Sequence, residues 1–296
     1  MAESQAVPAS TTDFNGILVA PAPWRLKCRT WTLLTSPLKT NKVNGKSTAV
    51  FPAGWASPFQ CDALAEGEFL GGPGMVMLVQ YTETPVGPYD ELIYIAGKFS
   101  MPDEDGKTKI AGNRITRIYV STKESTANGR RNWNIPKEVA DFKYTHKPDG
   151  SWDLAVSVAS TSSSESTKPF FHISTHPIPI LGSLRIPINS GILGSFMRIL
   201  QPPVPKGPPG SPPELVGSDT NADGSTKEAK WASLVPMTKG KMYLATYRPQ
   251  ISLAGQEREK GRMVIADGVH FPTVVPWSVA ICVEDGDIDF GVSEWY

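Results

Sequence analysis

The sequence lacks several features that would assign a protein to a class at once. Its 296 residues include three cysteines, Cys28, Cys61 and Cys282, and no C-x-x-C pair. Widely spaced cysteines in odd number argue against a disulfide framework and favour a reducing compartment. The formal net charge is zero, so the chain as a whole presents no field that attracts nucleic acid or an anionic membrane. No run reaches the ~18 apolar residues that a membrane-spanning helix needs.

Targeting and cofactor motifs are missing as well. The first fifteen residues have no basic start followed by an apolar run, so no signal peptide is expected, and we predict a soluble, cytoplasmic protein. No zinc motif, phosphate loop, dinucleotide fingerprint or G-x-S-x-G elbow is present, and we expect neither a metal nor a cofactor. His172 and His176 are four apart, which would suit a metal, but half-exposed strand histidines are the favoured interpretation.

Glycine and proline, in contrast, are abundant. The 26 glycines and 27 prolines leave few places for long helices. Many strand-length runs rich in Val, Ile, Thr or aromatic residues lie between them. This pattern predicts a mainly β fold with a few short helices, as a closed or nearly closed antiparallel β-barrel or a sandwich. Examples of these runs are Thr30–Leu34, Met75–Tyr81, Leu92–Phe99, Arg117–Ser121, Trp152–Ser160, Lys241–Tyr247 and Trp277–Val283.

The domain prediction is a flexible tail over residues 1–15 and a single domain over 16–296. An exposed Pro-rich loop is expected at 202–230, where PPVPKGPPGSPPE suits either a rigid spacer or a ligand of a proline-recognition domain. Ser160–Thr167 is predicted to be a hairpin tip.

Three helical segments are predicted. Cys61–Ala65 suits a single turn, and Pro136–Phe142 begins with a proline, which suits a first helical turn. Ile192–Leu200 carries apolar residues at helical spacing, as a core stripe or as a face for a partner.

One lysine stands out because of the residues around it. Residues 129–142 read GRRNWNIPKEVADF. Ile135 precedes a proline and is pushed toward extended geometry. Lys137 is then expected in the first turn of the helix that Pro136 opens. There the partial positive charge of the helix N-terminus favours the neutral amine over the ammonium.

The neutral form matters because lysine attacks a carbonyl group only as the free amine. An ordinary lysine is neutral in roughly one molecule in 2,500 at pH 7. Trp133 offers an apolar wall, and Arg130 and Arg131 offer positive charge. The pattern therefore predicts Lys137 as the reactive residue, with a solvated lysine at a helix start as the alternative.

The same segment resembles the active-site stretch of the acetoacetate decarboxylase superfamily. In that family a strand leads through Gly-Arg to Tyr/Ile-Pro-Lys, and here Tyr119 to Lys137 reads YVSTKESTANGRRNWNIPK. Upstream, GPYDE at 87–91 resembles the family's Tyr-x-Glu strand, and WRLKCR at 24–29 resembles the strand that carries an active-site arginine. The resemblance spans residues 20–145.

The resemblance implies a homo-oligomer that acts as a Schiff-base lyase on a small oxo-acid or related carbonyl compound. Lys137 would form an iminium, Glu91 would shuttle protons, and Arg29 would hold a substrate carboxylate. Trp133 and Glu138 are further expected in the substrate pocket. Decarboxylation, aldol cleavage and dehydration are the reactions that it implies.

The chain departs from the family pattern directly after the nucleophile, where the decarboxylases have a second lysine and this sequence has Glu138. A carboxylate facing Lys137 would favour the ammonium form, whereas a first-turn acid would complement a helix dipole. Glu91 can instead be satisfied by backbone amides or paired with Arg29 as a structural bridge. A second hypothesis is a non-catalytic barrel that binds an apolar metabolite or assists a secondary-metabolite or pigment pathway.

Overall fold

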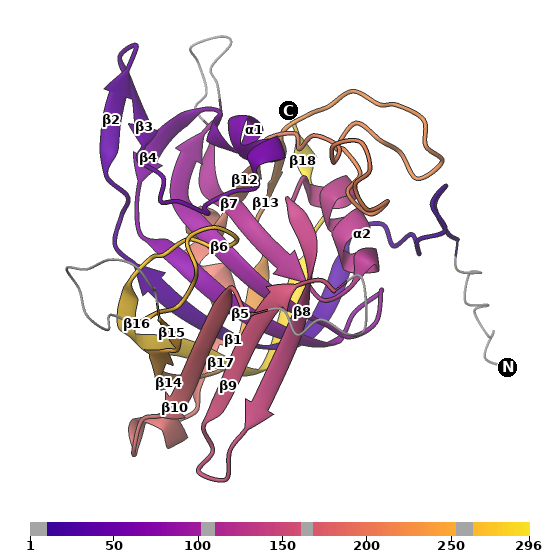
Figure 1. The fold of residues 1–296 in the computed structure, drawn as a ribbon. Coiled ribbons are helices and arrows are strands. Elements are labelled where there is room, and N and C mark those ends of the chain that lie inside the picture. Colours follow the sequence, from indigo (N-terminus) through magenta and orange to yellow (C-terminus); the bar gives the residue numbers. More distant parts are fainter. Residues whose placement is uncertain (1–10, 102–109, 161–167, 253–262) are drawn as a thin grey trace, which may run out of the picture.

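A computed structural model describes residues 11–101, 110–160, 168–252 and 263–296. The protein is mainly β, as predicted, and one sheet of 14 strands organises it (Figure 1). The strands of this sheet are β1 Trp24–Thr35, β4 Glu68–Gly71, β5 Gly74–Glu83, β6 Tyr89–Ser100, β7 Ala111–Val120, β8 Lys137–His146, β9 Trp152–Val158, β10 Phe171–Pro177, β11 Ile186–Asn189, β12 Ile199–Gln201, β13 Ala232–Leu234, β14 Met237–Pro249, β17 Pro276–Phe290 and β18 Glu294–Trp295.

The remaining elements are short. Two small two-stranded sheets lie outside the large sheet, β2 Thr40–Val43 with β3 Lys46–Ala49 and β15 Ile251–Ser252 with β16 Met263–Val264. The helices are α1 Cys61–Ala65 and α2 Lys123–Trp133, with 3-10 turns η1 Pro58–Gln60, η2 Leu181–Ser183 and η3 Ser190–Met197.

The strand order explains where α2 lies. Neighbours follow the order β18, β13, β12, β7, β8, β9, β10, β14, β17, β1, β5, β6, β4, with β11 added on β14 and a further pairing of β6 with β7. Most pairs are antiparallel, but β7 runs parallel to β8 and to β12. The sheet is therefore mixed, which corrects the expectation of a purely antiparallel one. A parallel step between consecutive strands needs a crossover, and α2 is that crossover between β7 and β8.

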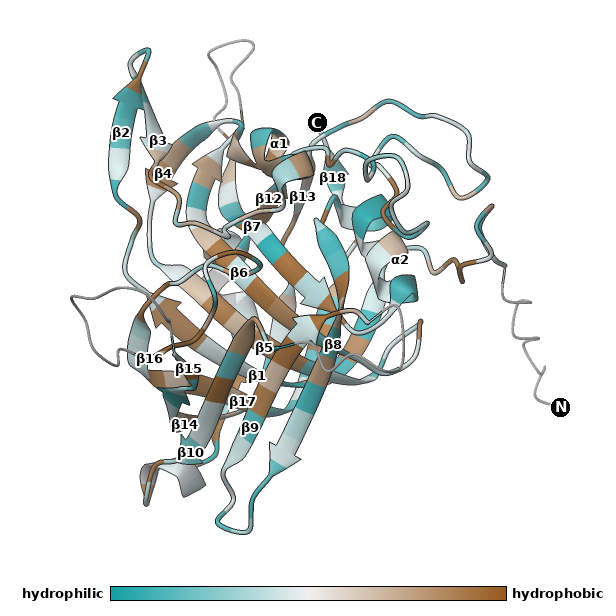
Figure 2. Ribbon diagram, in the orientation of Figure 1, coloured by the Kyte–Doolittle hydropathy of each residue, from teal (hydrophilic) through white to brown (hydrophobic). Residues whose placement is uncertain are grey.

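Two apolar clusters pack on opposite faces of the central strands. Along β6, Leu92 and Tyr94 belong to one cluster, whereas Ile93 and Ile95 belong to the other. Side chains alternate between the faces of a strand, so β6 is buried on both sides. Figure 2 shows hydrophobic residues along β5 and β6 and mostly hydrophilic residues on β2.

Helix α2 begins and ends at capping residues. The Thr122 side chain accepts a hydrogen bond from the Ser125 amide at 3.3 Å, and Asn134 ends the helix in the left-handed region with a φ of 54°. Threonine and asparagine are favoured at these two positions. The predicted helix at Pro136–Phe142 is wrong, because the residues from Lys137 onward form β8 in parallel register with β7.

Other sequence predictions have mixed outcomes. Cys61–Ala65 is a short helix, as predicted. Ile192–Leu200 is not one helix, because η3 is broken at Gly194 and β12 begins at Ile199. The Pro-rich loop at 202–230 contains no helix or strand, as predicted, but parts of it are buried, including Val204 and Val216.

The remaining predictions concern the N-terminal tail, the hairpin tip and membrane-spanning helices. Residues 1–10 of the tail and 161–167 of the hairpin tip lie outside the described residues. Within 11–15, Asp13 is buried and lies 2.7 Å from the Arg131 guanidinium. In the described ranges, no helix has the length and apolar character needed to span a membrane.

Candidate active site

The crossover through α2 brings Lys137 next to Glu91. Lys137 is the first residue of β8 and lies opposite Ile118 on one side of β7, while Glu91 of β6 lies opposite Val120 on the other side. Their side chains are each 4% exposed, and Lys137 Nζ lies 2.6 Å from Glu91 Oε1. The two predicted catalytic residues therefore form a buried ion pair.

Polar neighbours satisfy both members of this pair. Lys137 Nζ donates to Ser125 Oγ at 2.9 Å, and the Tyr81 hydroxyl donates to Glu91 Oε2 at 3.1 Å. The ring of Tyr89 lies beneath the amine, with its centroid 5.1 Å from Nζ. Such additional partners are what makes a buried ion pair tolerable.

One face of α2 lies against the side chain of Lys137. Ser125, Gly129 and Trp133 are four residues apart, so they share this face. A Cβ on Gly129 would lie 2.6 Å from Lys137 Cδ and 2.8 Å from Lys137 Cε. Glycine at this position therefore leaves room for the lysine stem to lie against the helix.

The neighbouring hydroxyl and thiol groups remain protonated. Burial raises the pKa of Tyr81 and of Tyr89 well above the usual range, and the negative charge of Glu91 acts in the same direction. Burial, followed by the charges of Glu91 and Asp287, raises the pKa of Cys28 to about 12. A thiol in this state is a poor nucleophile. The amine of Lys137 is thus the group in this cluster best suited to attack a carbonyl.

The ion pair lines a cavity with a volume of about 160 Å³. Among the described residues that line it, Glu91 and Lys137 are the only charged ones, and most others are apolar. Two tryptophans form part of the wall, Trp24 and Trp133, which pack edge to face with ring centroids 5.0 Å apart. Trp133, which the sequence analysis expects in the substrate pocket, is thus one of the residues that line this cavity.

Comparison with solved structures finds the same architecture elsewhere. An acetoacetate decarboxylase from Legionella pneumophila subsp. pneumophila str. Philadelphia 1 aligns with a TM-score of 0.50 and 10% identity over 99% of this chain and 92% of the other. A second acetoacetate decarboxylase aligns with a TM-score of 0.50 and 12% identity over 94% and 90% of the two chains. An acetoacetate decarboxylase-like enzyme from Sphingomonas wittichii RW1 gives a TM-score of 0.50 and 12% identity over 97% and 99%.

The chain has the acetoacetate decarboxylase fold. The resemblance noted from the sequence is confirmed at this level. No family model matches the sequence, and no curated protein matches it either.

Within this fold, Arg29 is separated from the lysine. Arg29 lies on β1 between Cys28 and Thr30. These two neighbours are buried, whereas Arg29 is exposed. Leu26 of β1 lines the cavity, whereas Arg29 lines a different pocket together with Gln80. Alternation along the strand points it to the opposite face. The predicted contact of Arg29 with a substrate beside Lys137 has no support in this geometry.

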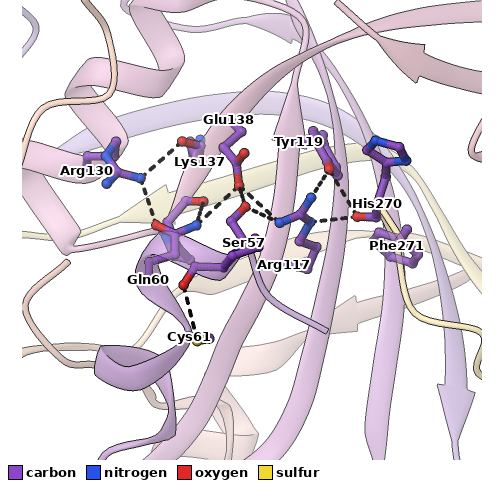
Figure 3. Close-up of polar contacts among 12 residues, drawn as sticks. Ser57, Gln60, Cys61, Arg117, Tyr119, Arg130, Lys137, Glu138, His270 and Phe271 are labelled. Carbon is purple, nitrogen blue, oxygen red and sulfur yellow. Dashed lines mark hydrogen bonds and ion pairs between the residues drawn. The ribbon is translucent and has the colours of Figure 1, made fainter. Parts of the chain in front are cut away.

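Glu138 also points away from Lys137 (Figure 3). Figure 3 shows its carboxylate directed at Ser57 and Arg117, and Oε1 lies 3.3 Å from Arg117 Nη1. Gln60 Nε2 donates to the same oxygen at 3.2 Å. Consecutive strand residues face opposite sides of a sheet, so the carboxylate that follows the lysine belongs to a polar network behind it.

Neither Arg130 nor Arg131 of α2 directs its guanidinium at the ion pair of Lys137 and Glu91. Arg130 donates to the carbonyl oxygens of Val216 at 2.7 Å and Pro205 at 2.6 Å, and to the main-chain oxygen of Lys137 at 3.3 Å. Arg131 pairs with Asp13. The buried parts of the Pro-rich loop are thus tied to the helix that positions the lysine.

Sequence reasoning missed Ser125, Gly129 and Tyr81. The capping residues Thr122 and Asn134 could have predicted α2, and the spacing of four residues would then have placed Ser125 and Gly129 on one face of it. Pairing the β5–β6 hairpin, which places Tyr81 opposite Tyr89, could have revealed the third. His172 and His176 lie partly buried on β10, and the described residues contain no group of three or more potential metal ligands.

Proposed function

We propose that the protein is a lyase that forms a Schiff base between Lys137 and a carbonyl substrate. The observation that carries the proposal is the buried pair of Lys137 and Glu91 on the wall of an apolar cavity, with 2.6 Å between amine and carboxylate. At this distance the ammonium can pass a proton directly to the carboxylate. The products are a free amine and a carboxylic acid, which are the two reagents that Schiff-base formation needs.

The first steps then follow from the contacts. Lys137 Nζ attacks the carbonyl carbon, and a proton moves from nitrogen to oxygen to give a carbinolamine. Glu91 returns its proton to this oxygen, which leaves as water, and the iminium forms. The Glu91 carboxylate then lies next to the positive iminium, while the Tyr81 hydroxyl holds its other oxygen at 3.1 Å.

The iminium acts as an electron sink for a bond on the neighbouring carbon. Loss of carbon dioxide and aldol cleavage each break a C–C bond whose electron pair converts the iminium into an enamine. In loss of water, Glu91 first removes the α-proton to form the enamine, which then expels the β-hydroxyl group as water with the proton from Glu91 and leaves a conjugated iminium. Glu91 is placed to supply or remove the proton at each stage. The fold shared with acetoacetate decarboxylases supports a Schiff-base lyase without choosing among these reactions.

Isotope exchange tests the proposal. An iminium acidifies the α-carbon of a ketone, so the protein should catalyse exchange of α-protons in D2O, followed by NMR. The substrates are acetone, 2-hexanone, acetoacetate and 4-oxopentanoate. We expect exchange with the natural chain, none above background with Lys137→Met, and a rate lower by about 10²–10⁴-fold with Glu91→Gln. Background exchange with every compound would contradict the proposal.

A second candidate is a binding protein for an apolar metabolite, which the largely apolar cavity wall favours. In that case Lys137 and Glu91 only neutralise each other. Such a protein would bind ketones without exchanging their α-protons, and Lys137→Met would leave the exchange at background level, unchanged from the natural chain.

We also propose that the sheet closes into the predicted barrel. Pairings run from β7 through β8, β9, β10, β14, β17, β1 and β5 to β6, and β6 pairs in turn with β7. This cycle supports closure around the strands that carry Lys137 and Glu91.

A further inference from the structure

We infer that the site takes an uncharged carbonyl compound with an apolar chain rather than an oxo-acid. The inference rests on the proposed role of Lys137 in forming a Schiff base. It starts from the charge of the cavity wall, where Lys137 and Glu91 are the only charged groups among the described lining residues and neutralise each other.

A substrate carboxylate would have no cation of its own in this cavity. Before reaction the Lys137 ammonium is balanced by Glu91, and after reaction the single charge of the iminium is balanced by the same carboxylate. A second carboxylate would leave one negative charge uncompensated in an apolar surrounding, which is strongly unfavourable. An uncharged ketone or aldehyde avoids this penalty at both stages.

The arginines that might compensate a carboxylate are engaged elsewhere. Arg29 is exposed and lines another pocket. Arg117 is paired with Glu138 in the network behind the lysine, and Arg130 donates to loop carbonyls. None of the three lines the cavity.

The rest of the wall suits a hydrocarbon chain. Ile93 and Ile95 are buried, Met75, Met77 and Met197 are half-buried, and all five line the cavity. Unbranched methionine side chains adapt to ligands of different shape. We infer that the carbonyl of the ligand lies at Lys137 and that its apolar chain lies along these residues.

The absence of a substrate carboxylate narrows the reaction to aldol chemistry or loss of water. In aldol cleavage, Glu91 takes the proton of a β-hydroxyl group, the C–C bond breaks, and its electron pair converts the iminium into a neutral enamine while an aldehyde leaves. The enamine carbon then recovers the proton from Glu91, and water hydrolyses the new iminium to release a ketone. Condensation is the same sequence in reverse.

The test compares two ligands of similar size, 2-hexanone and 4-oxopentanoate, whose binding is measured by ligand-observed NMR titration. We expect the dissociation constant of 2-hexanone to be lower on the order of tenfold or more. Met77→Lys adds a cation to the wall and should raise the affinity for 4-oxopentanoate, whereas the matched control Met77→Leu should keep the preference of the natural chain.

Equal or tighter binding of 4-oxopentanoate by the natural chain would overturn the inference, as would binding of neither compound or an unchanged preference in Met77→Lys. The outcome is separable from that of the proposed function. A preference for 2-hexanone without α-proton exchange rejects only the chemistry. Exchange combined with a preference for 4-oxopentanoate rejects only the substrate class.

Discussion

Lys137 and Glu91 depend on each other because both are buried. Removing one partner of such a pair leaves an uncompensated charge and costs about 3–5 kcal/mol, whereas apolar replacement of both is often close to neutral. We therefore expect Glu91→Leu to lower the free energy of unfolding by about this amount, and the double variant Glu91→Leu with Lys137→Met to recover most of it. Urea unfolding compares the natural chain, the two single variants and the double variant.

The comparison needs both single variants, Glu91→Leu and Lys137→Met, so that the four chains form a double-mutant cycle. If the double variant loses the sum of the two single losses, the residues are not coupled, and the ion pair does not organise the site.

Gly129 controls the position of the amine through space rather than charge. A Cβ added at Gly129 would overlap the lysine stem, because it would lie 2.6 Å from Lys137 Cδ. Gly129→Ala should raise helix propensity in α2 yet displace the stem, so we expect α-proton exchange to fall by at least about tenfold, in line with the loss that small misplacements cause. Lys123→Ala, on the exposed start of the same helix, is the matched control and should exchange at the natural rate. Equal rates for both variants would show that the close contact has no catalytic consequence.

At the scale of elements, the β7–α2–β8 crossover determines which residues meet. Strand alternation on β8 sends Lys137 into the cavity and Glu138 to Arg117. Glu138→Gln should therefore lower the free energy of unfolding by about 1–3 kcal/mol, because it removes the negative charge that pairs with the buried Arg117. It should leave α-proton exchange within a factor of about two of the natural rate, since the network lies behind the lysine.

Glu91→Gln makes the matched comparison for Glu138→Gln, because the same chemical change on the cavity side should lower the rate of exchange by about 10²–10⁴-fold. A loss of exchange in Glu138→Gln as large as that in Glu91→Gln would place Glu138 in the reaction.

The same elements show what the sequence could and could not reveal. The strands were readable from their β-branched and aromatic runs, and Lys137 and Glu91 from their local motifs. Helix α2 had readable caps at Thr122 and Asn134, but Pro136 suited the start of a helix as well as of a strand, and only pairing with β7 decides between them. The position of Arg29 depended on register, and a shift between Cys28 and Thr30 in the β1–β17 pairing is a tertiary feature without a local signal.

At the scale of the whole molecule, an ion pair joins the N-terminal segment to α2. Burial alone would raise the pKa of Asp13, but the amide of Ile17, the Arg131 guanidinium and the amide of Asn15 outweigh it and hold the pKa below its usual value. A carboxyl whose pKa is lower in the folded state stabilises the protein above its unfolded pKa of about 3.9, and this contribution is lost as the pH falls through the folded value.

We therefore expect the melting temperature to decline below about pH 4, with part of the decline due to Asp13. Asp13→Asn should melt lower than the natural chain at pH 7 and show a shallower decline toward pH 2. Parallel curves for the two chains, measured by circular dichroism across this range, would exclude a contribution from Asp13.

The attachment of the Pro-rich loop acts at the same scale. Arg130 of α2 holds the carbonyls of Pro205 and Val216, so residues distant in sequence support the helix that carries Ser125 and Gly129. The site therefore depends on distant parts of the chain, although its two reactive groups lie on β6 and β8, the strands on either side of β7.

The most direct measurement is reductive trapping. The protein is incubated with 2-hexanone and sodium borohydride, and the products are examined by intact mass and peptide mapping. We predict a stable secondary amine on Lys137, with one 2-hexyl group in place of a hydrogen, and no such product in Lys137→Met. An unlabelled protein, or a label that persists on other lysines when Lys137 is replaced, would contradict the claim that Lys137 forms the Schiff base.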